Sequence, residues 1–302
     1  MGNLYSQTFP PKARWSVQQM PDLKGKIAIV TGANVGIGKE TAKQLLARVY
    51  IAARSKSKAE TAIAELKAET GKEALFLELD LGDLVAIKRS AQAFLAAEPS
   101  LNILIANAGV WCPPMDELTK QGYDLQLGTN ALGHWYFTQL LLPGLLKGVS
   151  EGGARVVTLS SVGSDLAKPV IWDAFTDTPA RRKLTLYDLY NQSKLFNLLL
   201  SIEYARRYAD TGIIFSSLNP GNIETDLLRR VTGIQRSVLG MLLYPVQQGA
   251  LTSLYAATSP EATENGAYYI PWARRGVANA KARDPVTGAR VWEWMEEQIK
   301  GI

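Results

Sequence analysis

The chain has 302 residues, of which 47% are hydrophobic and 20% charged, with 33 Lys and Arg against 28 Asp and Glu. This ordinary globular composition excludes a disordered chain, a collagen and a coiled coil. The net charge of +5 does not indicate a nucleic-acid partner by itself, because such proteins usually carry a basic stripe interleaved with aromatic residues. The longest apolar stretch, 137–146, is interrupted by polar residues and is far shorter than the roughly 20 residues of a transmembrane helix.

Cysteine and histidine each occur once, as Cys112 and His134. A single cysteine excludes an intrachain disulfide, and together with the absence of a signal-peptide pattern it favours a reducing compartment, so we expect a cytoplasmic protein. One thiol and one imidazole are too few for a zinc cluster, so no metal site is expected. No linker or repeat divides the chain, which predicts an N-terminal extended arm (1–22) followed by one domain (23–302).

Short apolar runs alternate with helical patterns along the chain. Such runs suit strands that are buried on both faces of a parallel sheet. They occupy 26–31, 49–53, 74–79, 101–106, 154–159 and 213–218. Helical patterns occupy 39–47, 58–69 and 83–97, the last with Asp83 as its N-cap. The alternation predicts an α/β fold: a single-domain Rossmann fold with a doubly wound parallel sheet of about seven strands and helices on both faces.

A glycine-rich segment follows the first predicted strand. Gly32, Gly36 and Gly38 form the pattern G-x-x-x-G-x-G, and a helix begins there. A cofactor pyrophosphate must approach such a backbone closely, and the helix that follows offers unpaired N–H groups to the anion. The same glycines also suit an ordinary tight turn. The strand before them and the helix after them favour a dinucleotide-binding loop.

The residues after the second predicted strand indicate which cofactor binds. An acidic side chain there would hydrogen-bond a ribose 2′-hydroxyl, but the segment Arg54-Ser55-Lys56-Ser57-Lys58 contains none. Arg54 can hold a phosphate with its fork of N–H donors, which favours NADP over NAD. Lys56 and Lys58 suit a solvated helix start. The connection at 45–50 is roughly three residues shorter than such a unit needs. Either a short loop is missing from the sequence, or the chain is shortened there and the register that places Arg54 is less secure.

Tyr190 and Lys194 lie four residues apart in a long helical pattern over 186–208, so they share one helix face. An ammonium group beside a phenol favours the phenolate and lowers its pKa from about 10. Tyr190 then becomes usable as an acid or a base near neutral pH. Taken alone, the pair is also typical of an exposed helix surface.

These motifs occur in order with Asn107-Ala108-Gly109, Asn130, Ser160-Ser161 and Pro220-Gly221. Over residues 24–271 the chain therefore resembles the short-chain dehydrogenase/reductase family, in its retinol-dehydrogenase-like branch. The resemblance implies an NADP-dependent oxidoreductase, a carbonyl reductase or alcohol dehydrogenase that transfers a hydride between the nicotinamide and a carbonyl or alcohol carbon.

The resemblance also implies a role for each site residue. Tyr190 would be the catalytic acid or base, and Lys194 would tune it and hold the nicotinamide ribose. Ser161, with Ser160 as the alternative, would hydrogen-bond the substrate oxygen. Asn130 would order a water that relays protons to Lys194, and its position also suits a helix kink or cap. Implied cofactor contacts are Gly32, Asn34, Gly36, Ile37, Gly38, Arg54, Asp80, Leu81, Asn107, Ala108, Gly109, Tyr190, Lys194, Pro220, Gly221, Ile223 and Thr225.

The chain departs from the family in the length of the segment between Ser161 and Tyr190. So long a segment inside a domain is usually functional, and we expect the loops 162–189 and 222–245 to line a pocket for an apolar or aromatic substrate. The helices near 130–146 and 186–208 carry apolar side chains that suit either the core or a homodimer interface. The candidate residues for either role are Gln139, Leu140, Phe196, Leu199 and Leu200.

Three other functions fit the sequence less well. A catalytically silent NAD(P)-binding regulatory protein would lack parts of the motif set, and every part is present here. The Gly36-x-Gly38 spacing and the short part after Pro220 disfavour a sugar-nucleotide epimerase or dehydratase. A Ser-His-Asp hydrolase would need a G-x-S-x-G elbow, which the sequence lacks. Cys112 follows the Asn107–Gly109 motif closely, so it fits either the pocket wall or a small apolar filler.

Overall fold

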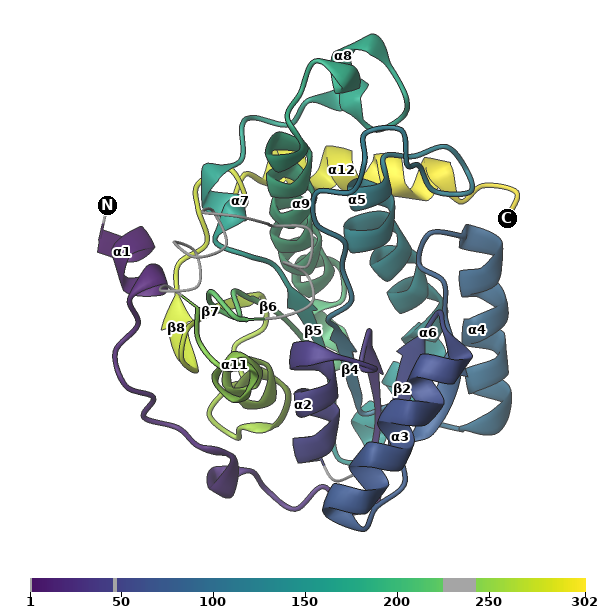
Figure 1. The fold of residues 1–302 in the computed structure, drawn as a ribbon, viewed down its shortest axis with the longest axis vertical. Helices are drawn as coiled ribbons and strands as arrows, with labels where there is room; N and C mark the ends of the chain where they lie inside the picture. Colours follow the sequence, from purple (N-terminus) through teal and green to yellow (C-terminus); the bar gives the residue numbers. More distant parts are fainter. Residues whose placement is uncertain (1, 46–47, 225–242) are drawn as a thin grey trace.

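The computed structural model describes residues 2–45, 48–224 and 243–302. Eight strands form one sheet in the order β3-β2-β1-β4-β5-β6-β7-β8 (Figure 1). The first seven strands run parallel, and β8 pairs antiparallel with β7. The strands are β1 (Ile27–Thr31), β2 (Arg48–Ala53), β3 (Leu75–Glu78), β4 (Ile103–Ala106), β5 (Ala154–Leu159), β6 (Ile213–Leu218), β7 (Ala267–Ile270) and β8 (Arg274–Gly276). The predicted doubly wound parallel sheet is confirmed, with the antiparallel β8 added at its edge.

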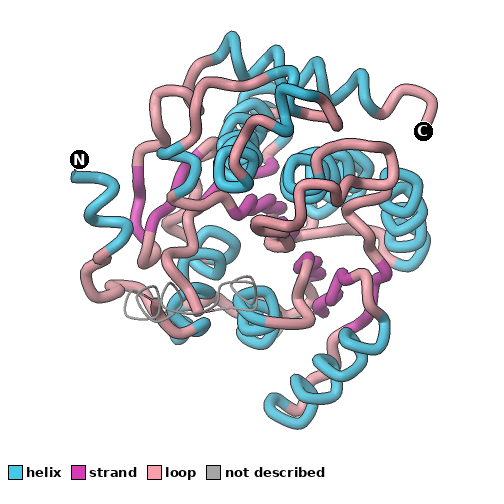
Figure 2. Tube along the Cα trace, turned by 45° about the horizontal axis from the view of Figure 1, so that its top comes forward, coloured by secondary structure: helices cyan, strands magenta, loops and turns pink. Residues whose placement is uncertain are grey.

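Helices cover both faces of the sheet, as Figure 2 shows. On one face lie α2 (Gly36–Leu45), α3 (Lys56–Thr70) and α11 (Val246–Thr258). On the other lie α4 (Leu84–Ala97), α6 (Gly133–Ser150), α9 (Leu186–Arg207) and α12 (Pro285–Gln298). Strand side chains alternate between the two layers, so that Ile51 packs on the first face and Tyr50 on the second. Asp83 caps α4 by accepting a hydrogen bond from the Val85 N–H, as the sequence predicts.

The C-terminal helix α12 packs across α6 and α9. The ring of Trp292 in α12 lies 5.4 Å from that of Trp135 and 4.7 Å from that of Tyr204. Phe196, Leu199 and Leu200, in α9, are buried within a single chain. These three side chains therefore belong to the core. Of the two roles that the sequence left open for them, the core or a homodimer interface, the structure supports the core.

The segment 162–189 is not a bare loop. It contains α7 (Gly163–Leu166), the short helix η3 (Trp172–Ala174) and α8 (Pro179–Arg182). Phe175 is buried against Phe196 and Trp294, and the Arg290 guanidinium lies 3.9 Å from the ring centre of Trp172. Phe175 therefore lies in the protein core, and Trp172 packs against that core while partly buried.

A buried ion pair fixes the same segment to the helices beneath it. Arg181 Nε donates to Asp124 Oδ2 at 2.9 Å, and both side chains are only 2% exposed. Asp124 also caps α5 (Leu125–Leu127) by accepting the N–H groups of Gln126 and Leu127. The segment is thus anchored at the helix that leads to Asn130.

The N-terminal residues differ from the expected extended arm. Residues Gly2–Thr8 form the helix α1, and Val17–Gln19 form the short helix η1. Trp15 is buried, and its ring packs edge-on against that of Tyr255 in α11. The arm is therefore docked on the domain, because its apolar side chains find partners there.

Two sequence predictions, the short connection at 45–50 and the loop 222–245, include residues outside the described ranges. Residues 46–47 separate α2 from β2, yet β2 pairs in register with β1 from Arg48 onward, so Arg54 directly follows the strand. Most of the predicted loop 222–245, with Thr225, lies outside the described residues. Among the described helices, none combines the length and the apolar composition needed to cross a membrane.

Candidate active site

The predicted glycine loop lies at the carboxyl edge of the sheet, between the ends of β1 and β4, where the strand order reverses. A Cβ on Gly32, which has φ +66°, would lie 2.9 Å from the Cα of Ala108. One on Gly38 would lie 2.5 Å from Nδ2 of Asn107. Glycine is therefore required so that this loop can pack against residues 107–108, in addition to any approach by a phosphate.

A hydrogen-bonded chain joins the ends of β1 and β4 to the start of α6. The Thr31 hydroxyl accepts the N–H groups of Asn107 and Ala108, each at 2.9 Å. The same oxygen lies 2.8 Å from Nε2 of His134, whose Nδ1 lies 3.1 Å from the Asn130 carbonyl. Because a carbonyl can only accept, Nδ1 carries the proton and Nε2 accepts from Thr31. Burial lowers the pKa of His134 to about 4, so the ring is neutral at physiological pH.

Asn130 lies in η2 (Gly128–Leu132), one turn of π-helix between α5 and α6. Such turns are frequent at functional sites. Its side-chain oxygen accepts from the Val110 N–H at 2.8 Å, and its Nδ2 donates to the Val110 carbonyl and to Ser193 Oγ, both at 3.0 Å. The Asn130 amide thus ties the loop after β4 to α9. Of the two roles weighed for Asn130, the helix irregularity is present, and the water relay stays a prediction.

Tyr190, Lys194 and Ser161 meet at this edge. Lys194 Nζ donates to the Leu159 carbonyl at 3.0 Å and lies 5.8 Å from the ring centre of Tyr190. The Ser160 hydroxyl donates to the Lys194 carbonyl at 2.7 Å, so it is directed into the α9 backbone. The Ser161 side chain instead accepts the Gly163 N–H at 3.1 Å and lies close enough to Tyr190 to lower the pKa of its phenol. Of the two serines, Ser161 is thus the one beside the phenol.

The protonation states differ from the sequence prediction. Burial raises the pKa of Tyr190 to about 12, although the hydrogen bond from Ser161 acts in the opposite direction. Burial lowers the pKa of Lys194 to about 8. The expected lowering of the phenol pKa by the ammonium is therefore wrong for this structure, because desolvation dominates both groups. At neutral pH the arrangement therefore holds a protonated phenol beside a protonated amine.

An aromatic side chain that the sequence motifs do not include, Trp111, lies beside Tyr190. The Trp111 ring lies 6.5 Å from the Tyr190 ring and 5.7 Å from that of Tyr187. Cys112 is close enough to influence the pKa of Tyr190, and burial raises the pKa of its own thiol to about 11. The only sequence signal for Trp111 and Cys112 is their position just after the Asn107–Gly109 motif.

Comparison with known proteins is consistent with this geometry. A family model described as short chain dehydrogenase matches residues 26–172. A short-chain dehydrogenase/reductase of Armillaria gallica is 52% identical over 99% of both chains. The chain belongs to the short-chain dehydrogenase/reductase family. Mouse retinol dehydrogenase 12 is 36% identical over 89% of this chain and 85% of its own.

Solved structures of the family share the fold. A 3-ketoacyl-(acyl-carrier-protein) reductase from Brucella melitensis, complexed with NADH, superposes with a TM-score of 0.65 at 25% identity, over 82% of this chain and 97% of its own. The Pseudomonas aeruginosa RhlG/NADP active-site complex gives a TM-score of 0.66 at 25% identity, over 83% and 95%. The protein is thus an oxidoreductase of this family, whose solved relatives bind a nicotinamide cofactor.

The remaining predicted cofactor residues of this family member lie along the same edge. Arg54 is exposed directly after β2 and makes no hydrogen bond or ion pair with the residues that the structure describes. Asp80 follows β3 and accepts the Gly82 N–H at 2.9 Å, and Leu81 beside it is buried. Further along the edge lie Asn34, Ile37, Gly109, Pro220, Gly221 and Ile223.

The described ends of the loop 222–245 are held together. Ile223 pairs with Tyr244 in a parallel bridge, and the Tyr244 N–H donates to the Asn222 carbonyl at 2.8 Å. The Glu224 N–H donates back to the Tyr244 carbonyl at 3.0 Å. Ile223 is thereby fixed next to the Pro220–Gly221 turn.

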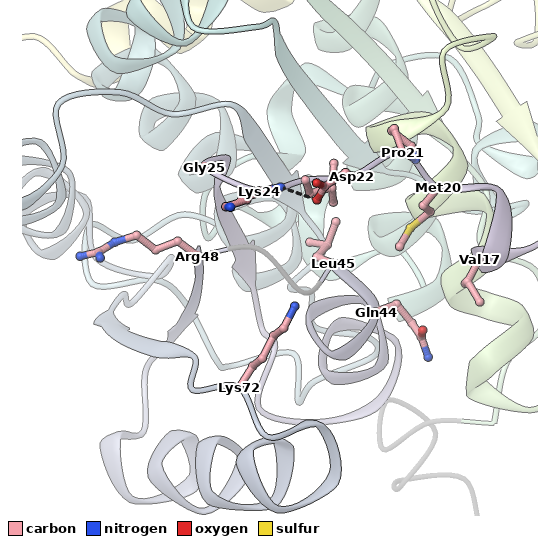
Figure 3. A pocket seen from close by; sticks show the side chains of 11 residues that line it. Val17, Met20, Pro21, Asp22, Lys24, Gly25, Gln44, Leu45, Arg48 and Lys72 are labelled. Carbon is pink, nitrogen blue, oxygen red and sulfur yellow. Dashed lines mark hydrogen bonds between the residues drawn. The ribbon is translucent and has the colours of Figure 1, made fainter.

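A cavity of about 530 Å³ lies at the opposite, amino edge of the sheet. It is bounded by the chain before β1, the end of α2 and the start of β2, including Asp22, Lys24 and Arg48 (Figure 3). None of the predicted site residues lines it. Tyr190, Lys194, Ser161 and the glycine loop all lie at the carboxyl edge of the sheet. This cavity is therefore not the candidate active site.

Proposed function

We propose that this oxidoreductase transfers a hydride between NADP and a carbonyl or alcohol carbon, with Tyr190 as the acid or base. The observation that carries the proposal is the meeting of Tyr190, Ser161 and Lys194 beside the glycine loop. Burial keeps the Tyr190 phenol protonated at neutral pH, so its hydroxyl carries the proton that carbonyl reduction consumes.

The residues of the edge fit a dinucleotide. The glycine loop opens α2 with unpaired N–H groups that suit a pyrophosphate. The cofactor supplies the hydride, and the protein supplies position and the proton. Ser161 would hold the carbonyl oxygen while the Tyr190 hydroxyl gives its proton to that oxygen. The positive charge of Lys194 would stabilise the phenolate left behind. Ile223, with Thr225, is proposed to contact the nicotinamide carboxamide.

Arg54 supports NADP rather than NAD. Its guanidinium is exposed at the end of β2 with no carboxylate partner among the described residues, so it is available for a 2′-phosphate.

Replacing Arg54 with Asp removes a charge-assisted bond of about 1.5–3 kcal/mol, which is roughly a 10- to 100-fold loss of affinity. We expect Arg54→Asp to lower kcat/KM with NADPH by this factor while activity with NADH stays or rises. Lys147→Asp, in α6, makes the same charge change at an exposed site and serves as the control. An unchanged cofactor preference in Arg54→Asp contradicts the assignment.

The substrate is proposed to be bulky and apolar or aromatic. Trp111 and Cys112 give the surroundings of Tyr190 an aromatic and weakly polar character. The segments 162–189 and 222–245 would complete the pocket. The 36% identity to a retinol dehydrogenase is consistent with an apolar substrate.

The test is cofactor oxidation with a panel of aryl ketones, aldehydes and retinoids, followed by absorbance with NADPH or NADH. Wild type is expected to turn over at least one of them. Tyr190→Phe should lose nearly all activity and still bind cofactor, whereas Tyr187→Phe, which removes an exposed hydroxyl one turn away, should retain it. Equal activity of wild type and Tyr190→Phe would refute the mechanism.

A further inference from the structure

The helix α1 docks on the carboxyl edge of the sheet, near α7 and β8 in Figure 1. Arg274, in β8, holds its C-terminal turn: the guanidinium donates to Ser6 Oγ at 3.1 Å and to the Ser6 carbonyl at 2.8 Å. Residues 2–8 lie outside the stretch 24–271 that carries the family motifs.

Gln7, in this helix, is buried to 1% exposure and uses both ends of its amide. Its oxygen accepts from Asn219 Nδ2 at 2.9 Å and from the Tyr268 hydroxyl at 3.1 Å. Its nitrogen donates to Asp165 Oδ2 at 3.0 Å. Because the oxygen faces two donors and the nitrogen faces a carboxylate, the amide has only one satisfied orientation.

Each partner of Gln7 leads to one side of the active site. The side-chain oxygen of Asn219 accepts the Gly221 N–H at 3.0 Å, so its amide is fixed between Gln7 and the Pro220–Gly221 turn. Asp165 belongs to α7, and the neighbouring Ser164 donates from its N–H and its hydroxyl to the Ser161 carbonyl, at 3.0 and 2.8 Å. Asp165 Oδ1 also accepts from Asn279 at 3.2 Å.

We propose that Gln7 is a positioning residue for the reaction. Through Asn219 it fixes the turn that would face the nicotinamide, and through Asp165 it fixes the segment that presents Ser161. The distance between the hydride donor and the held carbonyl then depends on an N-terminal helix. This inference rests on the proposed function, since only hydride transfer requires those two segments to be held in register.

Exchanging the amide of Gln7 and the carboxylate of Asp165 tests the hydrogen bond between them. Gln7→Glu sets a carboxylate against the Asp165 carboxylate, and Asp165→Asn leaves the Gln7 amide without its charged acceptor. A displacement of about 1 Å between reacting groups costs on the order of 100-fold in rate. We expect each single variant to lower kcat/KM at least roughly tenfold and to raise the Kd for NADPH. The double variant Gln7→Glu/Asp165→Asn restores a donor opposite a carboxylate and keeps the acceptors for Asn219 and Asn279, so both quantities should return towards wild type.

Tyr5→Ala, on the exposed side of the same helix at 68% exposure, is the matched control and should behave as wild type. NADPH binding, followed by cofactor fluorescence, separates this inference from the proposed function. If wild type binds NADPH but reduces no carbonyl, the proposed function fails, and the Kd values of the variants still decide the role of Gln7. The inference is overturned if the single variants Gln7→Glu and Asp165→Asn lower only the melting temperature and leave kcat, KM and Kd unchanged. If a single variant does not fold, a double variant that folds but stays impaired overturns it as well.

Discussion

The buried histidine predicts a specific loss of stability in acid. His134 is the one histidine of the chain, and it is neutral and fully hydrogen-bonded between Thr31 and Asn130. Burial lowers its pKa from the ordinary value of 6.5 to about 4. Between these two values the unfolded chain binds more protons than the folded one, so stability falls as the pH falls. The stability is complete above pH 6.5 and is lost progressively towards pH 4.

The magnitude follows from the two pKa values. Lowering the pH from 7.5 to 5 should cost about 2 kcal/mol of unfolding free energy through this single group. His134→Gln does not titrate there, and it keeps only one of the two hydrogen bonds. It should be less stable than wild type at pH 7.5 by about 1–3 kcal/mol, because one buried polar group loses its partner. The difference between the two proteins should then shrink as the solution is acidified.

The assay is urea unfolding, followed by tryptophan fluorescence at several pH values between 5 and 7.5. Carboxylates and the chain terminus titrate equally in both proteins, so their effects cancel in the difference. The ¹⁵N shifts of the imidazole should also report the tautomer with the proton on Nδ1. If wild type and His134→Gln lose the same stability over this range, or if the ring titrates near 6.5 in the folded protein, the hydrogen-bonded chain is wrong.

Three further predictions follow from the site and its supports. The alkaline limb of kcat/KM for carbonyl reduction should begin near pH 8, where Lys194 loses its proton; a profile flat to pH 10 contradicts a role for its charge. Asp124→Asn should cost up to about 3–5 kcal/mol by calorimetry, because it removes the buried carboxylate of Arg181 and leaves only Asp177, 3.5 Å away. Glu264→Gln, at an exposed ion pair, should cost under about 1 kcal/mol, and similar costs for the two variants would refute the reasoning. Trp111→Ala should raise the KM of a bulky aryl ketone far more than that of a small one without changing the Kd for NADPH, and equal changes would place Trp111 outside the substrate pocket.

Strands β1 to β6 were predictable from the sequence because most of their side chains are apolar and buried, whereas β7 and β8 were not predicted. The predicted apolar run at 154–159, for example, has the same limits as the observed strand β5 (Ala154–Leu159). The spacing of Tyr190 and Lys194 placed them on one helix face, which needs only helical geometry. The arm 1–22 was different: its helix α1 is short and polar, and it exists in contact with partners such as Asn219, 212 residues away.

Burial explains what the sequence could not give. The direction of the Tyr190 pKa depends on how much water reaches the phenol, and no spacing of residues contains that information. Phe175 follows the same logic: an aromatic residue in a long inserted segment suits a pocket wall, but α12 lies close enough to cover it. Arg181 and Asp124 lie 57 residues apart in the sequence and become partners only in the folded chain.

The central claim is that Tyr190 donates the proton during hydride transfer from a nicotinamide cofactor. The most direct measurement is single-turnover reduction of an aryl ketone by NADPH deuterated at C4, compared between wild type and Tyr190→Phe at matched cofactor saturation. In wild type the loss of NADPH absorbance should be slower with the deuterated cofactor than with unlabelled NADPH. Tyr190→Phe should still bind NADPH and transfer no label. Label transfer at the wild-type rate in Tyr190→Phe would contradict the account.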